Sequence, residues 1–137
     1  MISQKRKVAV YGSLLSGLHN NQLLGSSELL GSFESEPKFK MVAIGNDYPG
    51  VIKKGNTSIK MEVYNVDNLT LKGLDMLEGY KKSNKKDDNY YIRETIDTPY
   101  GKVFAYFYNK SIKELTVVKS GDWKEHLGHL KLTKYAK

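Results

Sequence analysis

The sequence predicts an α+β domain in which strands outnumber helices. Short runs rich in β-branched and aromatic residues are separated by turn-forming residues, which is typical of strands. One segment with leucines at helical spacing falls between strands instead of alternating regularly with them. Because 137 residues with 39% hydrophobic content suit one core, we expect a single domain over residues 1–137. A small mixed β-barrel is compatible with this pattern.

The first part of the chain is expected to contain short strands joined by loops. Lys7–Tyr11 alternates valine with other residues and runs into Gly12-Ser13, which predicts a strand that ends in a tight turn. Two further β-type runs lie on either side of a polar turn, and a turn-forming cluster at residues 46–50 follows them. These runs are Leu29–Phe33 and Lys40–Ile44.

Ser58–Val66 has the period-two pattern of a strand with one side toward solvent. Apolar residues at positions 59, 61 and 63 oppose Lys60 and Glu62, so we expect these two charged side chains to lie on the solvent side. Tyr64 and Val66 break the alternation at the end of the strand.

A helix is expected directly after this strand. Asp67-Asn68 offers an N-cap, and Gly79 suits a left-handed helix stop. Between them, apolar side chains recur at helical spacing and predict an apolar stripe on one side of the helix. The stripe consists of Leu71, Leu74 and Leu77.

Two antiparallel strands are expected in the second half of the chain. Tyr90–Ile96 and Lys102–Tyr108 are rich in aromatic and β-branched residues, and Thr98–Gly101 between them is a hairpin-type turn. Nearly every side chain from 103 to 108 is apolar or aromatic, so this strand is expected to be covered on both faces or folded into a barrel. Ser120–Trp123 is expected to form a further turn.

The charge and the cysteine content limit the possible functions. The net charge of +7 comes partly from Lys81–Asp88, which we interpret as a solvated loop, so nucleic-acid binding is not expected. The lack of cysteine excludes disulfides, thiolate metal sites, iron–sulfur clusters and thiol nucleophiles. No stretch approaches the ~18 apolar residues of a membrane span, and the N-terminal apolar run is too short for a signal peptide. We therefore expect a soluble, cytoplasmic protein.

Glu78 is the strongest candidate for a catalytic residue. On the expected helix it lies four residues after Leu74 and seven after Leu71, on the side of the apolar stripe. Burial disfavours the charged carboxylate, and the negative end of the helix dipole adds to this effect. The pKa of Glu78 should therefore rise toward the range of general acid–base catalysis. The alternative is that the helix frays before Glu78 and the side chain points to water beside Gly79.

Tyr11-Gly12-Ser13-Leu14 is the candidate binding loop. A strand that ends in a sharp, glycine-containing turn exposes backbone N–H groups, which can form an anion-binding nest. The alternative is an ordinary turn, since many strands end in Gly-Ser pairs. The segment matches neither the P-loop nor the dinucleotide-binding fingerprint, so ATP and NAD are not expected.

Tyr91 and Arg93 are a further candidate pair. They lie two residues apart on one face of a strand, where the hydroxyl can orient a polar substrate group and the arginine can fix a carboxylate. The alternative is that Arg93 pairs with a neighbouring acid. Ser13 lacks a Gly-x-Ser-x-Gly elbow, so a serine triad is not expected. His126 and His129 supply two ligands where a zinc site usually needs three or four, so no metal is expected.

Four short motifs follow one another along the chain. They are Tyr11-Gly12-Ser13-Leu14, Leu74-Asp75-Met76-Leu77-Glu78-Gly79, Tyr91-Ile92-Arg93 and Ser120-Gly121-Asp122-Trp123. In this order they resemble γ-glutamylcyclotransferase-like proteins over most of the chain. The sequence looks closest to the compact branch that includes γ-glutamylamine cyclotransferases and AIG2-like proteins. The resemblance implies a small barrel with flanking helices, and a pocket between the Tyr-Gly-Ser-Leu loop and the glutamate.

The resemblance also implies an activity. In such enzymes the free α-amine of a γ-glutamyl group attacks its own γ-carbonyl, which closes a five-membered ring and releases an amine and 5-oxoproline. It implies that Glu78 moves the protons, without a cofactor. It also implies that the backbone amides of Gly12, Ser13 and Leu14 hold the substrate's α-carboxylate. Residues that shape or support the pocket would be Tyr11, Tyr91 and Arg93.

Two other functions fit the same pocket. One is a different lyase or hydrolase that acts on a γ-glutamyl or similar amide. The other is a non-catalytic protein that binds a small anion or an acidic partner. A Glu78 buried beside Gly12–Leu14 favours an enzyme of the amide-cleaving lyase or acyltransferase type, whereas a surface Glu78 favours the binding protein. The leaving amine, the oligomeric state and any partner of Lys81–Asp88 are left open.

Overall fold

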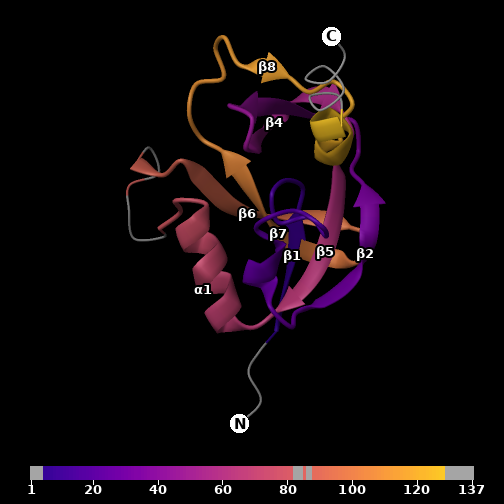
Figure 1. The fold of residues 1–137 in the computed structure, drawn as a ribbon, viewed down its shortest axis with the longest axis vertical. Helices are drawn as coiled ribbons and strands as arrows, with labels where there is room; N and C mark the ends of the chain where they lie inside the picture. Colours follow the sequence, from indigo (N-terminus) through magenta and orange to yellow (C-terminus); the bar gives the residue numbers. More distant parts are fainter. Residues whose placement is uncertain (1–4, 82–84, 86–87, 129–137) are drawn as a thin grey trace.

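The computed structural model describes residues 5–81, 85 and 88–128 of the chain, and its strands form two sheets. The five-stranded sheet has the order β2-β5-β1-β7-β6, and the three-stranded sheet has the order β4-β3-β8. In Figure 1, α1 lies on one side of the molecule and the three-stranded sheet lies at its top. The α+β class predicted from the sequence is confirmed.

The elements have the following bounds. The strands are β1 (Arg6–Val10), β2 (Glu28–Glu34), β3 (Phe39–Ile44), β4 (Tyr48–Thr57), β5 (Lys60–Val66), β6 (Tyr91–Thr98), β7 (Gly101–Tyr108) and β8 (Thr116–Val117). The helical elements are a 3-10 turn, η1 (Asn21–Leu24), the α-helix α1 (Asn68–Leu77), and residues 123–128.

β1 is the central strand of the larger sheet. It pairs antiparallel with β5, from Arg6 opposite Val66 to Val10 opposite Glu62, and parallel with β7 at Val8. The predicted hairpin of β6 and β7 is confirmed, since the two strands pair antiparallel along their whole length. Residues 105–107 of β7 are all buried, as expected for a strand covered on both faces.

The hydrogen-bonded ladders do not close into a barrel. Among the described strands, β2 and β6 lie at the two edges of the larger sheet. Tyr100, at the tip of the β6–β7 hairpin, reaches β2 with its side chain: its hydroxyl donates to the Ser32 carbonyl at 3.3 Å, and its ring packs on Phe33. The structure therefore has two open sheets in place of the closed barrel that the sequence suggested. The side chain of Tyr100 links the tip of the β6–β7 hairpin to the edge strand β2.

β4 was not expected from the sequence. The cluster at residues 46–50 predicts a break, yet the turn is confined to residues 45–47 and β4 begins at Tyr48. Pro49 pairs with Ala43 of β3. Proline is tolerated there because β4 is an edge strand of its sheet. On the outer side of such a strand no neighbouring strand needs a backbone N–H as a hydrogen-bond donor.

The helix α1 begins and ends as its sequence predicts. The carboxylate of Asp67 accepts the N–H of Thr70 at 2.7 Å, and Gly79 has φ of +63° just after the helix. The apolar stripe is shorter than expected. Leu71 and Leu74 are buried, whereas Leu77 is 41% exposed, because six residues at 3.6 per turn place it roughly 120° around the helix from Leu71.

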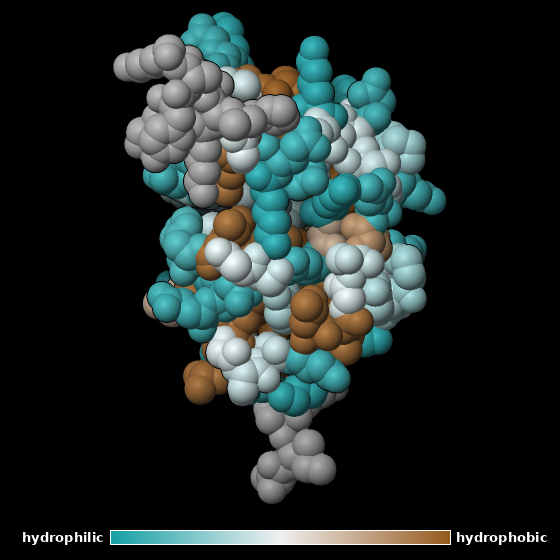
Figure 2. Space-filling model, turned by 45° about the vertical axis from the view of Figure 1, so that its right-hand side comes forward, coloured by the Kyte–Doolittle hydropathy of each residue, from teal (hydrophilic) through white to brown (hydrophobic). Residues whose placement is uncertain are grey.

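Two surfaces differ from a simple inside–outside pattern. The side of β5 predicted to face solvent is covered at Tyr64, which is 5% exposed. On α1, Leu69 and Met76 are almost fully exposed. Over the face drawn in Figure 2, hydrophilic residues are interspersed with separate apolar patches.

A turn over residues 119–122, close to the one predicted at Ser120–Trp123, ties the C-terminal part of the chain to β5. Gly121 has φ of +66°, and its carbonyl accepts the N–H of Lys60 at 2.9 Å. A Cβ at this position would lie 2.0 Å from the backbone carbonyl oxygen of Ser58. Trp123, just beyond the turn, is 1% exposed and belongs to the core. Only glycine fits here without moving backbone.

Gly121→Ala should therefore destabilise the fold by about 2 kcal/mol or more, because it adds both a steric clash and an unfavourable φ. Gly73→Ala is the matched control: Gly73 lies inside α1 with nothing within 4 Å of an added Cβ. This control should gain about 0.5–1 kcal/mol from helix propensity. Urea unfolding of both variants measures the two changes, and equal stability of the Gly121 variant and wild type would contradict the packing described.

Candidate active site

A pocket of about 580 Å³ lies where the C-terminal end of β1, the end of α1 and the start of β4 come together. Its walls also include residues of β6 and β7. Lining residues that were candidates from the sequence are Tyr11, Gly12, Ser13, Leu14, Glu78 and Tyr91. The chain thus brings six of the seven candidate residues to one cavity, from segments up to 80 positions apart in sequence.

Glu78 is the first residue after α1. Its N–H still donates to the Leu74 carbonyl at 3.0 Å, so the helical turn is intact at this position and does not fray before it. The side chain is largely withdrawn from solvent and lines the pocket. Burial raises the pKa of the Glu78 carboxyl to about 7. A carboxyl that titrates near neutrality can both accept and return a proton.

The loop that follows β1 forms the opposite wall. Gly12 and Leu14 are buried, and a Cβ on Gly12 would lie 2.6 Å from Cδ of Pro49, so only glycine allows the loop to pack this closely on β4. The backbone N–H groups of Gly12, Ser13 and Leu14 have no acceptor among the described residues. Donors at a pocket wall that lack a protein acceptor are suited to bind an anion.

Two buried tyrosines, Tyr11 and Tyr91, line the pocket and are held by hydrogen bonds to the backbone. Tyr11 donates its hydroxyl hydrogen to the carbonyl of Tyr106, and Tyr91 donates to the carbonyl of Pro49 at 2.8 Å. Burial, with a smaller contribution from the charge of Glu78, raises the pKa of both Tyr11 and Tyr91. These hydroxyls therefore remain protonated near neutral pH, and their hydrogen bonds to the backbone fix the rings.

Arg93 is the candidate that does not line the pocket. Its guanidinium donates to Asp75 at 2.6 Å and lies over the rings of Phe104 and Tyr80. The other oxygen of Asp75 accepts the hydroxyl hydrogen of Tyr106 at 2.6 Å. Arg93 thus pairs with a neighbouring acid, the alternative left open from the sequence, and contacts the pocket only through Asp75 and Tyr106.

The sequence did not indicate several other lining residues. They are Ala9, Val10, His19, Asn20, Ile44, Asp47, Tyr48, Pro49, Leu77, Gly79, Tyr90, Tyr106 and Tyr108. A usable signal lies in β7, where Tyr106 and Tyr108 interrupt an otherwise apolar strand at alternate positions, since a buried tyrosine needs a polar partner for its hydroxyl.

Other features raised by the sequence lie apart from this pocket. His126 stacks on Trp123, while His129 is outside the described residues, as is most of Lys81–Asp88. Within the described ranges, no three histidine, aspartate or glutamate side chains are grouped to hold a metal ion. The helices of those ranges include none with the length and apolarity needed to cross a bilayer.

Comparison with known proteins is consistent with this geometry. The model of the family described as "Gamma-glutamyl cyclotransferase, AIG2-like" matches residues 8–125. A Vibrio cholerae protein named "Putative gamma-glutamylcyclotransferase" is 39% identical over 116 residues, which cover 85% of this chain and 93% of that protein. The family match extends from within β1 past the end of β7 and so includes the pocket-lining segments.

Solved structures show the same fold. The solution NMR structure of ytfP from Escherichia coli has a TM-score of 0.67 at 33% identity, and the alignment covers 88% of this chain and 97% of that one. The crystal structure of an uncharacterized Pyrococcus horikoshii protein has a TM-score of 0.74 at 23% identity, covering 96% and 99%, which speaks for the fold alone. The chain therefore belongs to the γ-glutamylcyclotransferase, AIG2-like family.

Proposed function

We propose that this protein is a cyclotransferase that converts a γ-glutamyl-amine or γ-glutamyl-amino acid to 5-oxoproline and a free amine. Glu78 is the general acid and base of this proposal. The observation that carries it is the position of Glu78. A carboxyl with a pKa raised to about 7 by burial lines the same pocket as a row of backbone N–H donors that have no acceptor among the described residues.

The loop after β1 binds the γ-glutamyl group in this proposal. The amides of Gly12, Ser13 and Leu14 receive its α-carboxylate, because short backbone donors hold an anion without bringing a titrating side chain near the reacting amine. The fixed rings of Tyr11 and Tyr91 shape the cavity around the glutamyl chain. The bound chain is thereby bent, with its α-amine next to its own γ-carbonyl.

The chemical step is an intramolecular acyl transfer. Glu78 takes a proton from the α-ammonium, and the free amine attacks the γ-carbonyl carbon to form the ring C–N bond. The protonated Glu78 then gives its proton to the leaving nitrogen as the original amide C–N bond breaks. The ring nitrogen still carries one extra proton after the attack, and Glu78 takes this proton and passes it to the released amine. The amine leaves as an ammonium, and 5-oxoproline keeps a neutral ring N–H. Atoms and charge balance without a cofactor. Since both reacting groups belong to one molecule, holding them in contact supplies much of the rate enhancement.

Glu78→Gln should lower kcat/KM by about 10²-fold or more, because the amide preserves the shape of the side chain but cannot accept the proton. Release of 5-oxoproline is measured with a γ-glutamyl-amine, a γ-glutamyl dipeptide, an ε-lysine conjugate and glutathione. Glu36→Gln is the control, since Glu36 is an exposed residue paired with Lys38. Equal rates for wild type and Glu78→Gln would contradict the proposed role of Glu78.

The pH dependence of wild type should follow the base form of Glu78. Because the pKa is raised to about 7, kcat/KM should increase as the pH rises from 5.5 to 8, with a midpoint near 7. Initial rates at constant ionic strength give the profile. A midpoint near the ordinary glutamate pKa of about 4.3 would contradict the proposed role.

Stability should show the opposite trend. A carboxyl whose pKa is raised on folding stabilises the native state at low pH, and this contribution is lost as the pH rises through about 7. Glu78→Gln should therefore be more stable than wild type at pH 8, by on the order of 2 kcal/mol after allowance for solvent screening. The difference should vanish near pH 4. Thermal or urea unfolding at the two pH values measures it, and a pH-independent difference would argue against a buried, titrating Glu78.

A further inference from the structure

A second carboxylate, Glu62, lies beneath the candidate binding loop. It projects from β5, between Val10 of β1 and Ser32 of β2, on the side of the sheet that the sequence predicts to face water. Its side chain is only 13% exposed, because the chain from the end of β1 to η1 crosses over it. A charged residue in the middle of a sheet needs partners, and the crossing loop supplies them.

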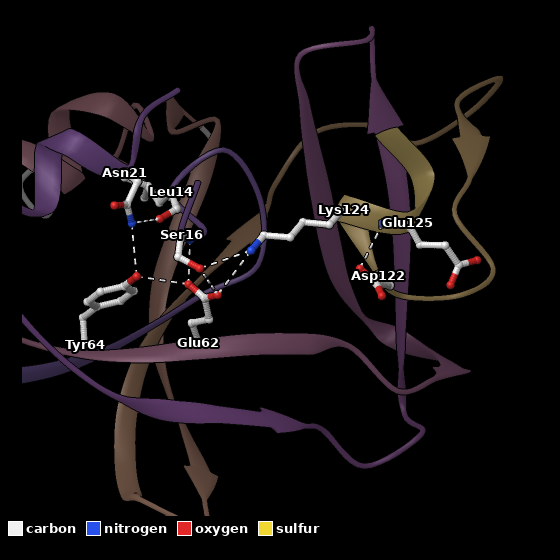
Figure 3. A network of polar contacts seen from close by, with 8 residues as sticks. All are labelled: Leu14, Ser16, Asn21, Glu62, Tyr64, Asp122, Lys124 and Glu125. Carbon is white, nitrogen blue, oxygen red and sulfur yellow. Dashed lines mark hydrogen bonds and ion pairs between the residues drawn. The ribbon is translucent and has the colours of Figure 1, made fainter. Parts of the chain in front are cut away.

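The polar groups around this carboxylate are hydrogen-bond donors or cations. The backbone N–H of Ser16 donates to Oε1 and its hydroxyl donates to Oε2, both at 2.8 Å. The hydroxyl of Tyr64 donates to Oε1 at 3.1 Å, and Lys124 lies 3.6 Å from Oε2 (Figure 3). Lys124 also donates to the Ser16 hydroxyl at 3.1 Å. The pair of bonds to Ser16 fixes both the position and the orientation of one peptide of the loop.

The balance of these contacts keeps Glu62 charged. Burial alone would raise the pKa of its carboxyl, but the hydrogen bonds from Ser16 and Tyr64 and the charge of Lys124 outweigh burial, so the pKa is lowered. This is the reverse of Glu78, whose pKa is raised by burial. Glu62 is thus a fixed anion at neutral pH, suited to hold a segment in place and not to exchange protons.

The same network extends to the residues that line the pocket. The side-chain amide of Asn21 donates to the Tyr64 hydroxyl at 3.1 Å and to the carbonyl of Leu14 at 2.8 Å. Figure 3 shows this path from Glu62 through Tyr64 and Asn21 back to Leu14. The Leu14 carbonyl and the Ser16 N–H flank Leu15, so the network anchors the backbone on both sides of this buried residue.

We propose that Glu62 is a positioning residue for the candidate site: it holds the loop so that the amides of Gly12, Ser13 and Leu14 point into the pocket. This inference rests on the proposed function. Leu14 and Leu15 of the loop are buried as well. Apolar contacts are not directional, so they hold the loop against the core but do not fix the direction in which its N–H groups point. Directional bonds to a charged acceptor set that direction before the substrate arrives, so less ordering is required on binding.

Glu62→Ala and Glu62→Gln test the proposal. Alanine removes all the acceptors, whereas glutamine keeps one oxygen for the Ser16 N–H and loses the ion pair with Lys124. Glu34→Gln is the matched control, because Glu34 lies on the adjacent strand β2, its side chain is 63% exposed, and it is ion-paired with Lys60 and not with the loop. Lys124→Met removes the ion pair and leaves the carboxylate in place.

The first readout is amide hydrogen exchange of residues 13–21 without any substrate. Exchange at Ser16 should be about 100-fold faster in Glu62→Ala, with a smaller increase in Glu62→Gln, while the β1 and β7 amides keep their protection. The second readout is kinetic. KM should rise by about 10-fold with kcat changed less than about 3-fold, the pattern of lost ground-state binding. Glu34→Gln should match wild type in both.

The two readouts separate this proposal from the one it rests on. If wild type releases no 5-oxoproline from any substrate, the cyclotransferase proposal fails, and titration with 5-oxoproline replaces KM as the measure of carboxylate binding. Unchanged Ser16 exchange in Glu62→Gln and Glu62→Ala would overturn the positioning role in either case. A fall in kcat with unchanged KM would overturn it as well. If Glu62→Ala fails to fold, the Ser16 exchange rate in Glu62→Gln still decides.

Discussion

The central place of β1 is the constraint on which the rest of the molecule depends. β1 pairs with β5 on one side and β7 on the other, so its three last residues are almost completely buried. The chain leaving such a strand must turn sharply, and it passes so close to Pro49 that position 12 has room only for glycine. Packing at the C-terminal end of β1 therefore fixes the path of the candidate binding loop. The backbone N–H donors of this loop face a cavity and not a neighbouring strand.

The candidate site contains a carboxyl, that of Glu78, whose charged form is disfavoured by burial. Among the described residues Glu78 has no ion-pair partner, and its raised pKa means that ionisation near pH 7 costs free energy which the rest of the fold must supply. The apolar core provides this stabilising free energy, since its buried residues from both sheets form one connected cluster. A site that gains acid–base reactivity at the expense of stability is a recurrent feature of enzymes.

Local chemistry made much of this fold predictable. Asp67, Gly79 and the Thr98–Gly101 turn act within a few residues of their own positions, and the helix and hairpin they delimit were predicted from them. β4 was missed because Pro49 signals a break unless its strand lies at an edge, which depends on tertiary structure. Glu62 was assigned to a solvent-facing side for a similar reason: a period of two identifies two faces of a strand but does not reveal that a loop covers one.

The sequence was also informative about the site, though unevenly. Glu78 and the loop at 11–14 were identifiable because helical spacing and a Gly-Ser turn point to them, and the family resemblance joined them. Arg93 illustrates the limit, since its position on a strand gives no way to tell a substrate carboxylate from that of Asp75. Tyr106 was missed because its hydroxyl partner comes from a helix 31 residues away.

Two carboxyls at the C-terminal end of α1, Asp75 inside the helix and Glu78 just after it, have different surroundings. Asp75 and Glu78 are three residues apart and so lie on neighbouring parts of one helix face. Asp75 is held by Arg93 and Tyr106 at 2.6 Å each, whereas Glu78 has burial as the cause of its raised pKa. Asp75 is thus paired with a cation and also fixes Tyr106 beside the pocket, whereas Glu78 has no ion-pair partner among the described residues. The second carboxyl is then free to hold a proton near neutrality, which two equally paired carboxylates would not allow.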